Sequence, residues 1–362
     1  MDPAPRRKRN ALYAAAAAAS IALVALAGPL EPAPGPITST GKALAELEPR
    51  ITVNAANTPG DAVALYRITQ PGSYILAGNI QGVGGKHGIA ITCGGVTLDL
   101  NGFDMVGLAG IGGALDGVSV TAVDQTAVTI RNGSIRGWGG DGIDLGTANT
   151  NNSRVTGLRI SANAGHGLTV GTGCAVTDCS VFGNNLTGIT TAGGCKVSGC
   201  TSYSNIGHGI VAGTGSAVDG CTSYFNDAAG ISVGNGCTVE GNTCRLNTND
   251  GILAAAACVI RGNTCTTNGF GTGDGAGVHV TGTDCRVEAN ACMLSDRGID
   301  VDTSGNLIIR NTCTGNTINW AIASGNAIGP IVVPATKTSS INGNAPAPST
   351  LGTADPFANF NY

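Results

Sequence analysis

Short aliphatic pieces alternate with polar turn residues along the chain, and from Val155 onward this alternation has a fixed period. The leading aliphatic positions lie 21 residues apart, with one longer interval, at Val155, Val176, Val197, Val218, Val239, Ile260, Val287 and Ile308. A second aliphatic position closes each unit, at Leu168, Ile189, Ile210, Ile231, Ile252, Val278, Ile299 and Ile322. A period of this length predicts a solenoid, whose repeats bury their apolar faces by stacking on one another.

The pattern inside each unit favours strands over helices. Pieces such as Cys195-Lys196-Val197 and Gly209-Ile210-Val211 are separated by Gly, Asn, Asp and Ser, which is strand and turn chemistry. Helical repeats need longer units with 3.6-residue spacing, and leucine-rich repeats need a Leu-rich signature. Each unit is therefore predicted to form one coil of a parallel β-helix, with neighbouring coils about 4.8 Å apart.

Polar columns accompany the aliphatic ones and predict side-chain ladders. Eight residues after the leading aliphatic position the chain places Asn163, Asn184, Asn205, Asn226, Asn247, Asn268, Ser295 and Asn316. Three residues after it stand Cys179, Cys200, Cys221, Asn242, Asn263, Asn290 and Asn311. Asn tolerates left-handed backbone geometry, and its amide can bond to the equivalent residue of the next coil, so both columns are interpreted as packing features.

Further phrases precede the periodic region: Gln70-Pro71-Gly72-Ser73-Tyr74, Val96-Thr97-Leu98-Asp99-Leu100-Asn101-Gly102-Phe103 and Val128-Thr129-Ile130-Arg131-Asn132-Gly133. With them the chain resembles the right-handed parallel β-helix proteins of the pectate-lyase-like superfamily, over about Gly72 to Val332. The nearest resemblance is to secreted bacterial β-helix proteins of unassigned function. It implies an all-β, single-stranded right-handed parallel β-helix of about ten coils, and it does not indicate a reaction.

The ends of the chain predict export and caps. Residues 1–27 have a basic start, an Ala-rich apolar stretch and the sequence Ala25-Leu26-Ala27, which together are typical of a cleaved signal peptide. Residues 28–46 form a Pro/Ala/Thr-rich linker, 47–82 an N-terminal cap, 83–333 the β-helix, and 334–362 a C-terminal cap or disordered tail. We expect a secreted or periplasmic monomer that does not insert into the membrane after signal cleavage.

Charge narrows the set of partners. After cleavage the chain would carry 15 Lys and Arg against 22 Asp and Glu, a net charge of −7. This balance argues against nucleic acid and against anionic lipid, because both are bound by excess Lys and Arg. A polysaccharide or a cell-surface component is the expected partner.

Thirteen cysteines in an exported chain would usually indicate disulfides. Here they fall into columns: Cys174, Cys195, Cys237, Cys258 and Cys285 lie two residues before the leading aliphatic position, and Cys244, Cys265, Cys292 and Cys313 lie five after it. Stacked side chains with parallel Cβ vectors lie wider apart than the ~3.8 Å that a disulfide prefers. Buried free thiols are the preferred interpretation, and disulfides within a column stay an open alternative.

Known catalytic motifs are mostly absent. Two Gly-His-Gly phrases, at His166 and His208, are similar to the polygalacturonase motif, but the Asn-Thr-Asp, Asp-Asp and Arg-Ile-Lys phrases of that family are missing. Both histidines occupy a variable position just before Gly-aliphatic, so we interpret them as turn residues. No Asp-Pro-His phrase, typical of the epimerase group of β-helix proteins, occurs either.

One cluster of ionisable residues lies where the 21-residue period is interrupted. Strand alternation places Asp300 and Asp302 on the outer face, with His279 of the preceding coil beside Asp300, and Asp296 and Arg297 flank the same strand. An enlarged loop, Gly269 to Gly277, lies next to it and contains Asp274. We predict His279, Asp300 and Asp302 as catalytic and Asp296 and Arg297 as substrate-binding, against the alternative of an ordinary solvated face. No cofactor is expected; Ca²⁺ stays open without a specific motif.

Two further features bear on glycan binding. Trp138, Asp141 and Asp144 form a second candidate patch with a possible sugar-stacking ring, and Phe182, Tyr203 and Tyr224 share one column. The three rings would be a sugar-stacking strip if they point outward; we expect them to point inward. The leading hypothesis is a non-catalytic glycan-binding protein, with a polysaccharide lyase, hydrolase or epimerase, and a purely structural surface or adhesion module, as alternatives.

Overall fold

The computed structural model describes residues 49–108, 113–146, 150–270, 275–333, 341–343 and 355–361. The predicted signal peptide, the predicted linker and Asp274 lie outside these residues. The chain from Arg50 onward is one compact unit, and the following description concerns that unit. In the part of the chain that the structure describes, no helix is long and apolar enough to cross a membrane.

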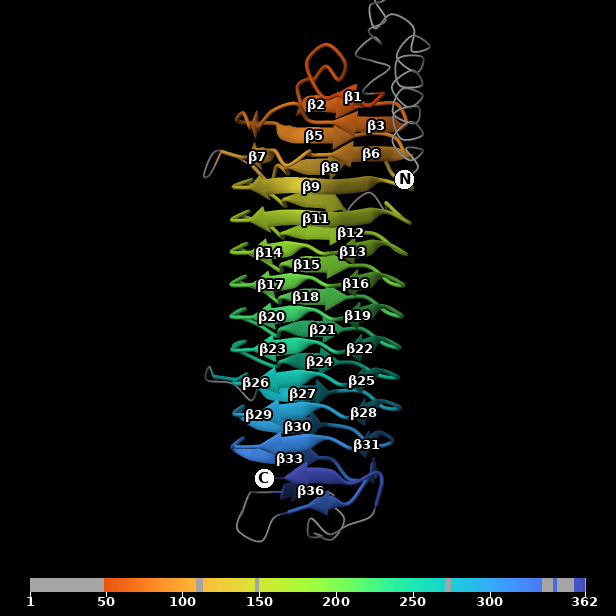
Figure 1. Ribbon diagram of the computed structural model, residues 1–362, viewed down its shortest axis with the longest axis vertical. Helices are drawn as coiled ribbons and strands as arrows, with labels where there is room; N and C mark the ends of the chain where they lie inside the picture. The colour runs from red at the N-terminus through yellow and green to blue at the C-terminus, as the bar shows by residue number, and fades with distance from the viewer. Residues whose placement is uncertain are drawn as a thin grey trace, which may run out of the picture. The chain divides into compact units, whose positions relative to one another are not determined.

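The unit is a stack of parallel β-strands wound into two sheets (Figure 1). The sheet that we call sheet B has 13 strands, one in each turn: β2 (Ala64–Ile68), β5 (His87–Ile91), β8 (Val118–Val120), β10 (Ile143–Leu145), β12 (Leu168–Val170), β15 (Ile189–Thr191), β18 (Ile210–Ala212), β21 (Ile231–Val233), β24 (Ile252–Ala254), β27 (Ala276–Val280), β30 (Arg297–Val301), β33 (Ile318–Ile322) and β36 (Ile341–Gly343).

The other sheet, which we call sheet A, has 24 strands, because most turns contribute two short strands separated by a corner. Its strands are β1 (Ile51–Thr52), β3 (Gly72–Ile75), β4 (Ile80–Gln81), β6 (Val96–Asp99), β7 (Asp104–Val106), β9 (Thr129–Arg136), β11 (Arg154–Ser161), β13 (Ala175–Thr177), β14 (Ser180–Phe182), β16 (Lys196–Ser198), β17 (Thr201–Tyr203), β19 (Ala217–Asp219), β20 (Thr222–Tyr224), β22 (Thr238–Glu240), β23 (Thr243–Arg245), β25 (Val259–Arg261), β26 (Thr264–Thr266), β28 (Arg286–Glu288), β29 (Ala291–Met293), β31 (Leu307–Ile309), β32 (Thr312–Thr314), β34 (Ala327–Ile328), β35 (Ile331–Val332) and β37 (Asn359–Asn361).

The strand register confirms the predicted columns. Val155 pairs with Val176, Val176 with Val197, and so on down sheet A, while Leu168 pairs with Ile189 on sheet B. The last closing position was placed wrongly: Ile299 pairs with Trp320, and Ile322 pairs with Val301. The indole of Trp320 fills the inward position, so the closing residue of this turn is aromatic instead of aliphatic.

The stack has about thirteen turns, more than the ten predicted. The additional turns lie at both ends: upstream, where the period is irregular, and downstream, where β36 adds a turn. Ile89 pairs with Val118 and Val118 with Ile143, which are intervals of 29 and 25 residues. A search for a 21-residue repeat does not detect turns whose loops differ in length.

Inward aliphatic residues from both sheets form one continuous core along the stack. All thirteen cysteines are free; twelve of them are buried, and Cys93 is half-buried. Burial raises the pKa of the Cys313 thiol, because a thiolate would be poorly solvated in the core. The preferred interpretation of the columns as buried thiols is therefore confirmed.

The Asn columns form hydrogen-bonded ladders inside the stack. The side-chain amide of Asn226 donates to the Oδ1 atom of Asn247 (3.0 Å), and that of Asn247 donates to Asn268 (2.9 Å). The same oxygens accept the backbone N–H of the preceding turn, as Asn247 Oδ1 does from Asn226 (3.2 Å). Since these groups are buried, each rung satisfies polar atoms that water does not reach.

Corners between the paired strands of sheet A adopt left-handed backbone geometry. Asp178 at the corner between β13 and β14 has φ 55°, and the equivalent Gly199 has φ 62°. The left-handed residue interrupts strand alternation, so the inward side changes parity from one strand to the next. Val176 is buried before the corner, and Cys179 and Val181 are buried after it.

Candidate functional site

The predicted catalytic residues meet on the outer face of sheet B. His279 in β27 pairs in register with Asp300 in β30, as expected. The imidazole Nε2 lies 3.1 Å from Asp302 Oδ2 and 3.9 Å from Asp300 Oδ2. Its Nδ1 lies 3.3 Å from Asp250 Oδ2, a contact that the sequence interpretation missed. We call His279, Asp250, Arg297, Asp300 and Asp302 the charged patch.

Exposure divides the charged patch into supporting and accessible groups. Asp300 is buried and forms an ion pair with Arg297, whereas half of the Asp302 side chain is exposed. Asp250 is buried, and its Oδ1 accepts the backbone N–H of Ala276 (2.8 Å). Asp296 directly precedes β30 and is half-buried, and its carbonyl accepts the N–H of Ile318. The groups that a ligand could reach are Asp302, part of Arg297 and the edge of His279.

The electrostatics of the patch hold a proton on His279. Burial alone would lower the pKa of His279, but the carboxylates of Asp250, Asp302 and Asp300 outweigh it and raise the pKa to about 9. Burial also raises the pKa of Asp300, while Arg297 and His279 act in the opposite direction. Near neutral pH the imidazole is therefore a cation between carboxylates, and it is not available as a neutral base.

Three side chains of the patch could together hold a metal ion. One ligand atom from each of His279, Asp300 and Asp302 lies within 4.8 Å of the others. A metal ion would have to displace the proton of His279 and compete with the Arg297 guanidinium for Asp300. In the present arrangement these donors are paired with one another.

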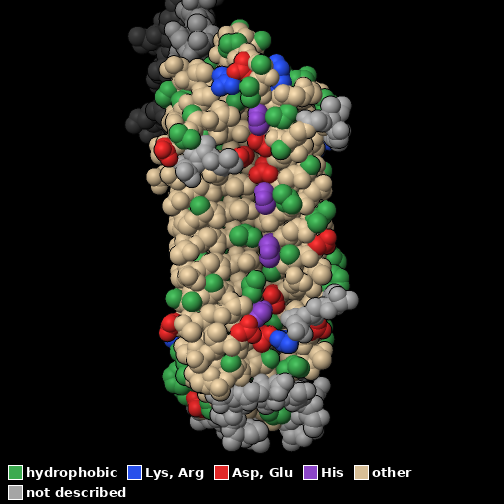
Figure 2. All heavy atoms as spheres, turned by 180° about the vertical axis from the view of Figure 1, so that it is seen from behind, with side chains coloured by type: hydrophobic (Ala, Val, Ile, Leu, Met, Phe, Trp, Pro, Cys, Tyr) green, Lys and Arg blue, Asp and Glu red, His purple; other side chains and the backbone are tan. Residues whose placement is uncertain are grey.

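The histidines of the chain lie in one line on this face (Figure 2). His166 Nδ1 accepts the backbone N–H of Thr187 and His208 Nδ1 accepts that of Ala229, each at 3.2 Å. A ring nitrogen that accepts carries no proton, so both rings are neutral with the proton on Nε2. Both Gly-His-Gly histidines thus bond to the backbone of the next turn, as expected of turn residues.

The second candidate patch is only partly assembled. Trp138 is 4% exposed and packs in the core, with its Nε1 3.3 Å from the Met105 carbonyl. The expectation that it offers a ring to a sugar is wrong, because Trp138, two residues after the end of β9, packs its indole among aliphatic side chains of the core. Asp141 bonds to the His166 N–H and the Thr169 hydroxyl, and Asp144 caps the turn at Gly146. Burial raises the pKa of Asp141, although these two hydrogen bonds oppose the shift.

The aromatic column points outward, contrary to our expectation. Phe182, Tyr203 and Tyr224 are half-buried, whereas the residues before them (Val181, Ser202 and Ser223) are buried. The rings of Phe182 and Tyr203 stack at 4.8 Å with an interplanar angle of 7°, and those of Tyr203 and Tyr224 at 4.8 Å and 4°. Phe225 meets Tyr224 edge-on at 5.7 Å. We call these four residues the aromatic strip.

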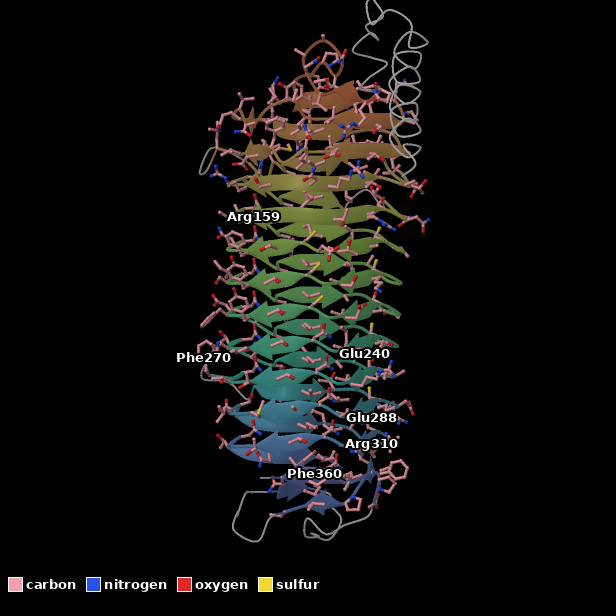
Figure 3. The ribbon with its side chains drawn as sticks, viewed as in Figure 1. Arg159, Glu240, Phe270, Glu288, Arg310 and Phe360 are labelled. Atoms are coloured by element: carbon pink, nitrogen blue, oxygen red, sulfur yellow. The ribbon has the colours of Figure 1, made fainter. Side chains whose placement is uncertain are left out.

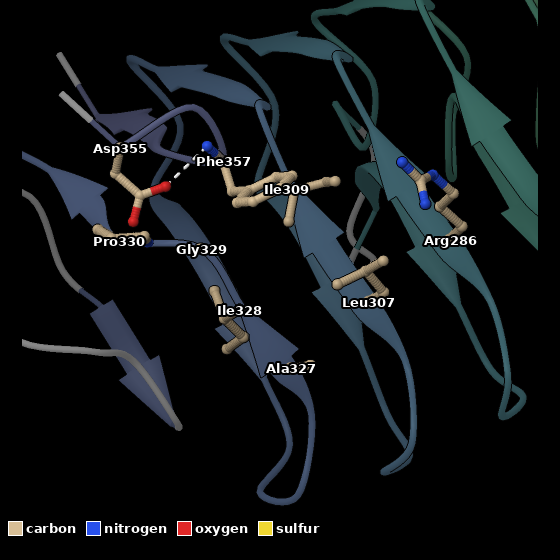
Figure 4. A pocket seen from close by; sticks show the side chains of 9 residues that line it. All are labelled: Arg286, Leu307, Ile309, Ala327, Ile328, Gly329, Pro330, Asp355 and Phe357. Atoms are coloured by element: carbon tan, nitrogen blue, oxygen red, sulfur yellow. Dashed lines mark hydrogen bonds between the residues drawn. The ribbon is translucent and has the colours of Figure 1, made fainter.

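A cavity of about 510 Å³ lies elsewhere, at the C-terminal end of sheet A (Figure 4). Leu307, Ile309 and Ile328 form its apolar wall, and Phe357 from the C-terminal segment borders it. Arg310 lies over the Phe357 ring at 5.4 Å and donates to the Pro356 carbonyl. The cavity therefore marks where the C-terminal segment packs on sheet A, and the charged patch does not line it.

Asp250 could have been found from the sequence by a diagonal rule. Asp141, in the column before Gly-aliphatic, bonds to Thr169, which lies 28 residues later in the following turn. Asp250 reaches His279 along the same diagonal, 29 residues later, because that turn contains the enlarged loop. The sequence signal has two parts. An Asp stands directly before Gly-aliphatic, and a polar residue stands three positions after the equivalent residue of the next turn.

Comparison with known proteins identifies the fold. A family model for the right handed beta helix region matches residues 188–344. The A-module of the mannuronan C-5 epimerase AlgE6 from Azotobacter vinelandii is similar in structure, with a TM-score of 0.56 and 18% identity over 78% of this chain and 89% of that one. The A-module of AlgE4 from the same organism gives a TM-score of 0.51 and 14% identity, over 78% and 91% of the two chains.

No curated protein matches the chain at the level of sequence. At 14–18% identity the structural likeness concerns the fold and not the chemistry of the site. The predicted right-handed parallel β-helix fold is confirmed.

Proposed function

We propose that this chain, a right-handed parallel β-helix, binds a polysaccharide along the outer face of sheet A without transforming it. The observation that carries the proposal is the aromatic strip. Its rings point outward in three successive turns, beside a column of hydroxyl-bearing residues: Ser180, Thr201, Thr222, Thr243 and Thr264. Structural neighbours with a mannuronan epimerase name support a glycan as the ligand.

The aromatic strip offers an apolar and a polar surface, which match the two kinds of surface on a sugar. Sugars have apolar C–H faces and polar hydroxyl rims, and Tyr combines an apolar ring with a polar tip. Stacking covers both faces of Tyr203, so its ring edge and hydroxyl are the accessible parts. Phe182 stacks on one side only, and on the other side its neighbour in register is the small Ser161. The open face of Phe182 is therefore where a sugar ring could stack.

The repetition of the strip favours a polymer over a small molecule. Equivalent side chains recur at each turn, about 4.8 Å apart, and solenoids generally use such extended surfaces for binding. The three stacked rings of the strip are half-buried on the outer face, and the cavity of about 510 Å³ lies elsewhere. A chain that lies along the β-helix axis would contact several turns at once.

The proposal is tested by affinity electrophoresis of the wild type against a panel of neutral and acidic polysaccharides. The double variant Tyr203→Thr/Tyr224→Thr uses a residue that stands in the same column at Thr266 and Thr314, so the fold is expected to tolerate it. We expect at least a tenfold loss of affinity for the polysaccharide bound. Ile206→Ser, which removes another exposed apolar side chain, is the matched control. Unchanged affinity in the double variant contradicts the proposal.

The charged patch favours a second candidate function, acid–base chemistry on a polysaccharide. A protonated His279 beside a carboxyl group with a raised pKa is an arrangement that can hold and transfer a proton. Incubation with the same panel, with unsaturated-product absorbance and reducing ends as readouts, tests this candidate. Activity that survives both Asp300→Asn and the more accessible Asp302→Asn would remove the patch as its site.

We further propose that the protein acts outside the cytoplasm, as a monomer and without a metal cofactor. The basic and apolar start of the chain supports export, and the paired state of His279, Asp300 and Asp302 supports metal independence. Cell fractionation, light scattering and binding in the presence of EDTA are the corresponding measurements.

A further inference from the structure

Arginines gather on the outer face of β9 and β11, the two eight-residue strands of sheet A that run through the corner without a break. Arg131 and Arg136 are exposed in β9, and Arg154 and Arg159 are exposed in β11. The strands pair in register, with Arg159 opposite Ser134 and Arg136 opposite Ser161, so the arginines are interleaved across the pair. We call these four residues the arginine face; Figure 3 labels Arg159 at its edge.

The arginine face is incompletely neutralised. Asp99 pairs with Arg131 at 3.1 Å, and Asp104 pairs with Arg136 at 2.8 Å. Within the described part of the chain, the guanidinium groups of Arg154 and Arg159 have neither a hydrogen bond nor an ion pair. Guanidinium groups present planar, forked donors that match carboxylate, sulfate and phosphate oxygens.

Most other basic residues of sheet A behave differently, although Arg245 in β23 is, among the described residues, also exposed and unpaired. Lys196 pairs with Asp219 at 3.4 Å, and Arg261 pairs with Glu240 at 2.7 Å, each across one turn. Arg286 and Arg310 share Glu288, at 2.6 and 2.8 Å. Cross-turn ion pairs are thus the usual arrangement on this sheet, and Arg154 and Arg159 lack the acidic neighbour that would form them.

The arginine face continues into the aromatic strip. In register down one column stand Arg136, Ser161, Phe182, Tyr203, Tyr224 and Arg245. Arg136 and Phe182 are two turns, or about 10 Å, apart, with the small Ser161 between them. The open face of Phe182 therefore looks toward Arg136, and Arg159 lies two positions along the strand from Ser161. The column from Arg136 to Arg245 spans five turns, or about 24 Å.

The opposite face has the opposite charge. Along sheet B and the residues next to its strands lie seven carboxylates: Asp116, Asp141, Asp144, Asp250, Asp296, Asp300 and Asp302. Figure 2 shows acidic side chains close to the line of histidines. A polyanion is repelled from that face and attracted to the arginine face, so charge decides which side it occupies.

We infer that the arginine face binds the oxyanion groups of a linear acidic glycan, whose sugar rings continue along the aromatic strip. This inference rests on the proposed glycan binding and names the chemistry of the ligand. Arg154 and Arg159 contact the anionic groups directly because their donors are free. Phe182 and Arg136 flank the position of the nearest sugar ring.

The test uses three polymers with one backbone: dextran, carboxymethyl dextran and dextran sulfate. We expect the wild type to bind a charged dextran at least tenfold more tightly than dextran, with affinity that falls as salt rises. The two charged polymers distinguish a carboxylate from a sulfate as the recognised group. Equal affinity for dextran and both charged polymers, or binding of none of the three, overturns the inference.

Variants locate the binding. Arg154→Gln/Arg159→Gln removes two unpaired charges, and we expect at least a tenfold rise in the dissociation constant for the charged polymer. Lys196→Gln/Arg261→Gln removes the same charge from the same sheet and is the matched control, with an expected change below threefold. Equal losses in both variants would show a general charge effect and overturn the site. If these results overturn the inference but Tyr203→Thr/Tyr224→Thr weakens binding of a neutral polysaccharide, the proposed function still stands.

Discussion

The turns from Leu168 to Val233 and the turns from Ile252 to Val301 share one strand register, yet the residue before the glycine acts differently in them. In the first stretch His166 and His208 bond to the backbone of the next turn. In the second, Asp250 and Arg297 also reach side chains, namely His279 and Asp300. In the regular stretch these polar residues bond one turn to the next. In the later stretch they also form the charged patch.

The number of acceptor atoms explains this difference. A neutral imidazole has one accepting nitrogen, and here the backbone N–H occupies it. A carboxylate has two oxygens: Asp250 gives Oδ1 to Ala276 and keeps Oδ2 for His279. Asp141 divides its oxygens between the His166 N–H and the Thr169 hydroxyl in the same way. An Asp in this column can therefore support the stack and a site together, whereas a His supports the stack alone.

The largest expected effect comes from a substitution that breaks the Asn ladder in the regular stretch. Asn247→Ala leaves the Asn226 N–H and the Ser223 carbonyl without their buried partner, and we expect it to lower the free energy of unfolding by about 4 kcal/mol. Chemical denaturation measures the change. Asn247→Ser is the control, because Ser295 fills the same column and accepts the Asn268 N–H; a loss as large as that of Ala would contradict the ladder account.

The next largest effect comes from a substitution that changes the charge of the patch and keeps the hydrogen bond between turns. In Asp250→Asn the amide oxygen still accepts the Ala276 N–H, but the charge beside His279 is lost, so the pKa of His279 should fall by about one unit or more from its value of about 9. NMR titration of the imidazole measures it. Since the raised pKa stabilises the fold below the unfolded value near 6.5, wild-type stability should fall as pH rises through about 9.

Less of that alkaline loss is expected in Asp250→Asn, and thermal unfolding at a series of pH values provides the comparison. An imidazole that titrates at the same pH in wild type and variant would show that Asp250 does not set the charge of His279.

His208 should give the opposite pH dependence. Burial is the main cause that lowers its pKa below 6.5, so its contribution to stability is complete above that pH and is lost as pH falls through the lower folded value. His208→Asn keeps an acceptor for Ala229 and has no group that titrates in this range, so it should reduce the acid loss. Thermal unfolding between neutral and acidic pH distinguishes it from His279→Asn, which should change the alkaline side. Identical acid profiles for His208→Asn and the wild type would contradict this assignment.

The smallest effect concerns the thiol columns. Cys195→Ser should change the free energy of unfolding by less than about 1 kcal/mol, because Ser216 already occupies the next position of that column. Thiol labelling of the folded wild type should modify Cys93 first, since the other cysteines are buried. Rapid labelling of Cys195 in the native protein would show that the column opens to solvent.

The sequence predicts the stack well because the period is a property of neighbouring turns. Val155, Val176 and Val197 must lie above one another if each repeat is one coil, and the ladder of Asn residues follows. The sequence does not predict in the same way which direction the Phe182 side chain points. Alternation counted from Val176 points Phe182 inward, but the left-handed Asp178 at the corner changes the parity of the strand. Corner geometry is a backbone property that the spacing of aliphatic residues does not reveal.

The candidate site was predictable in part for a related reason. His279, Asp300 and Asp302 lie in or next to sheet B strands of two successive turns, so register alone brings them together. Asp250 joins them from a third turn along a diagonal that depends on side-chain length and loop size. The arginine face is not predicted by the repeat, because Arg131 and Arg136 lie upstream of the strict period and an interval of 25 residues separates their strand from the strand of Arg154 and Arg159.

The Asn ladder also bears on how such a protein can change in evolution. Each rung bonds to an equivalent rung 21 residues away, so removal or duplication of 21 residues in the regular stretch joins two surfaces that already match. The aromatic strip lies in that stretch, and a duplicated turn would lengthen it by one rung of about 4.8 Å. The length of polymer that the aromatic strip can contact can therefore change by whole turns, without a new fold.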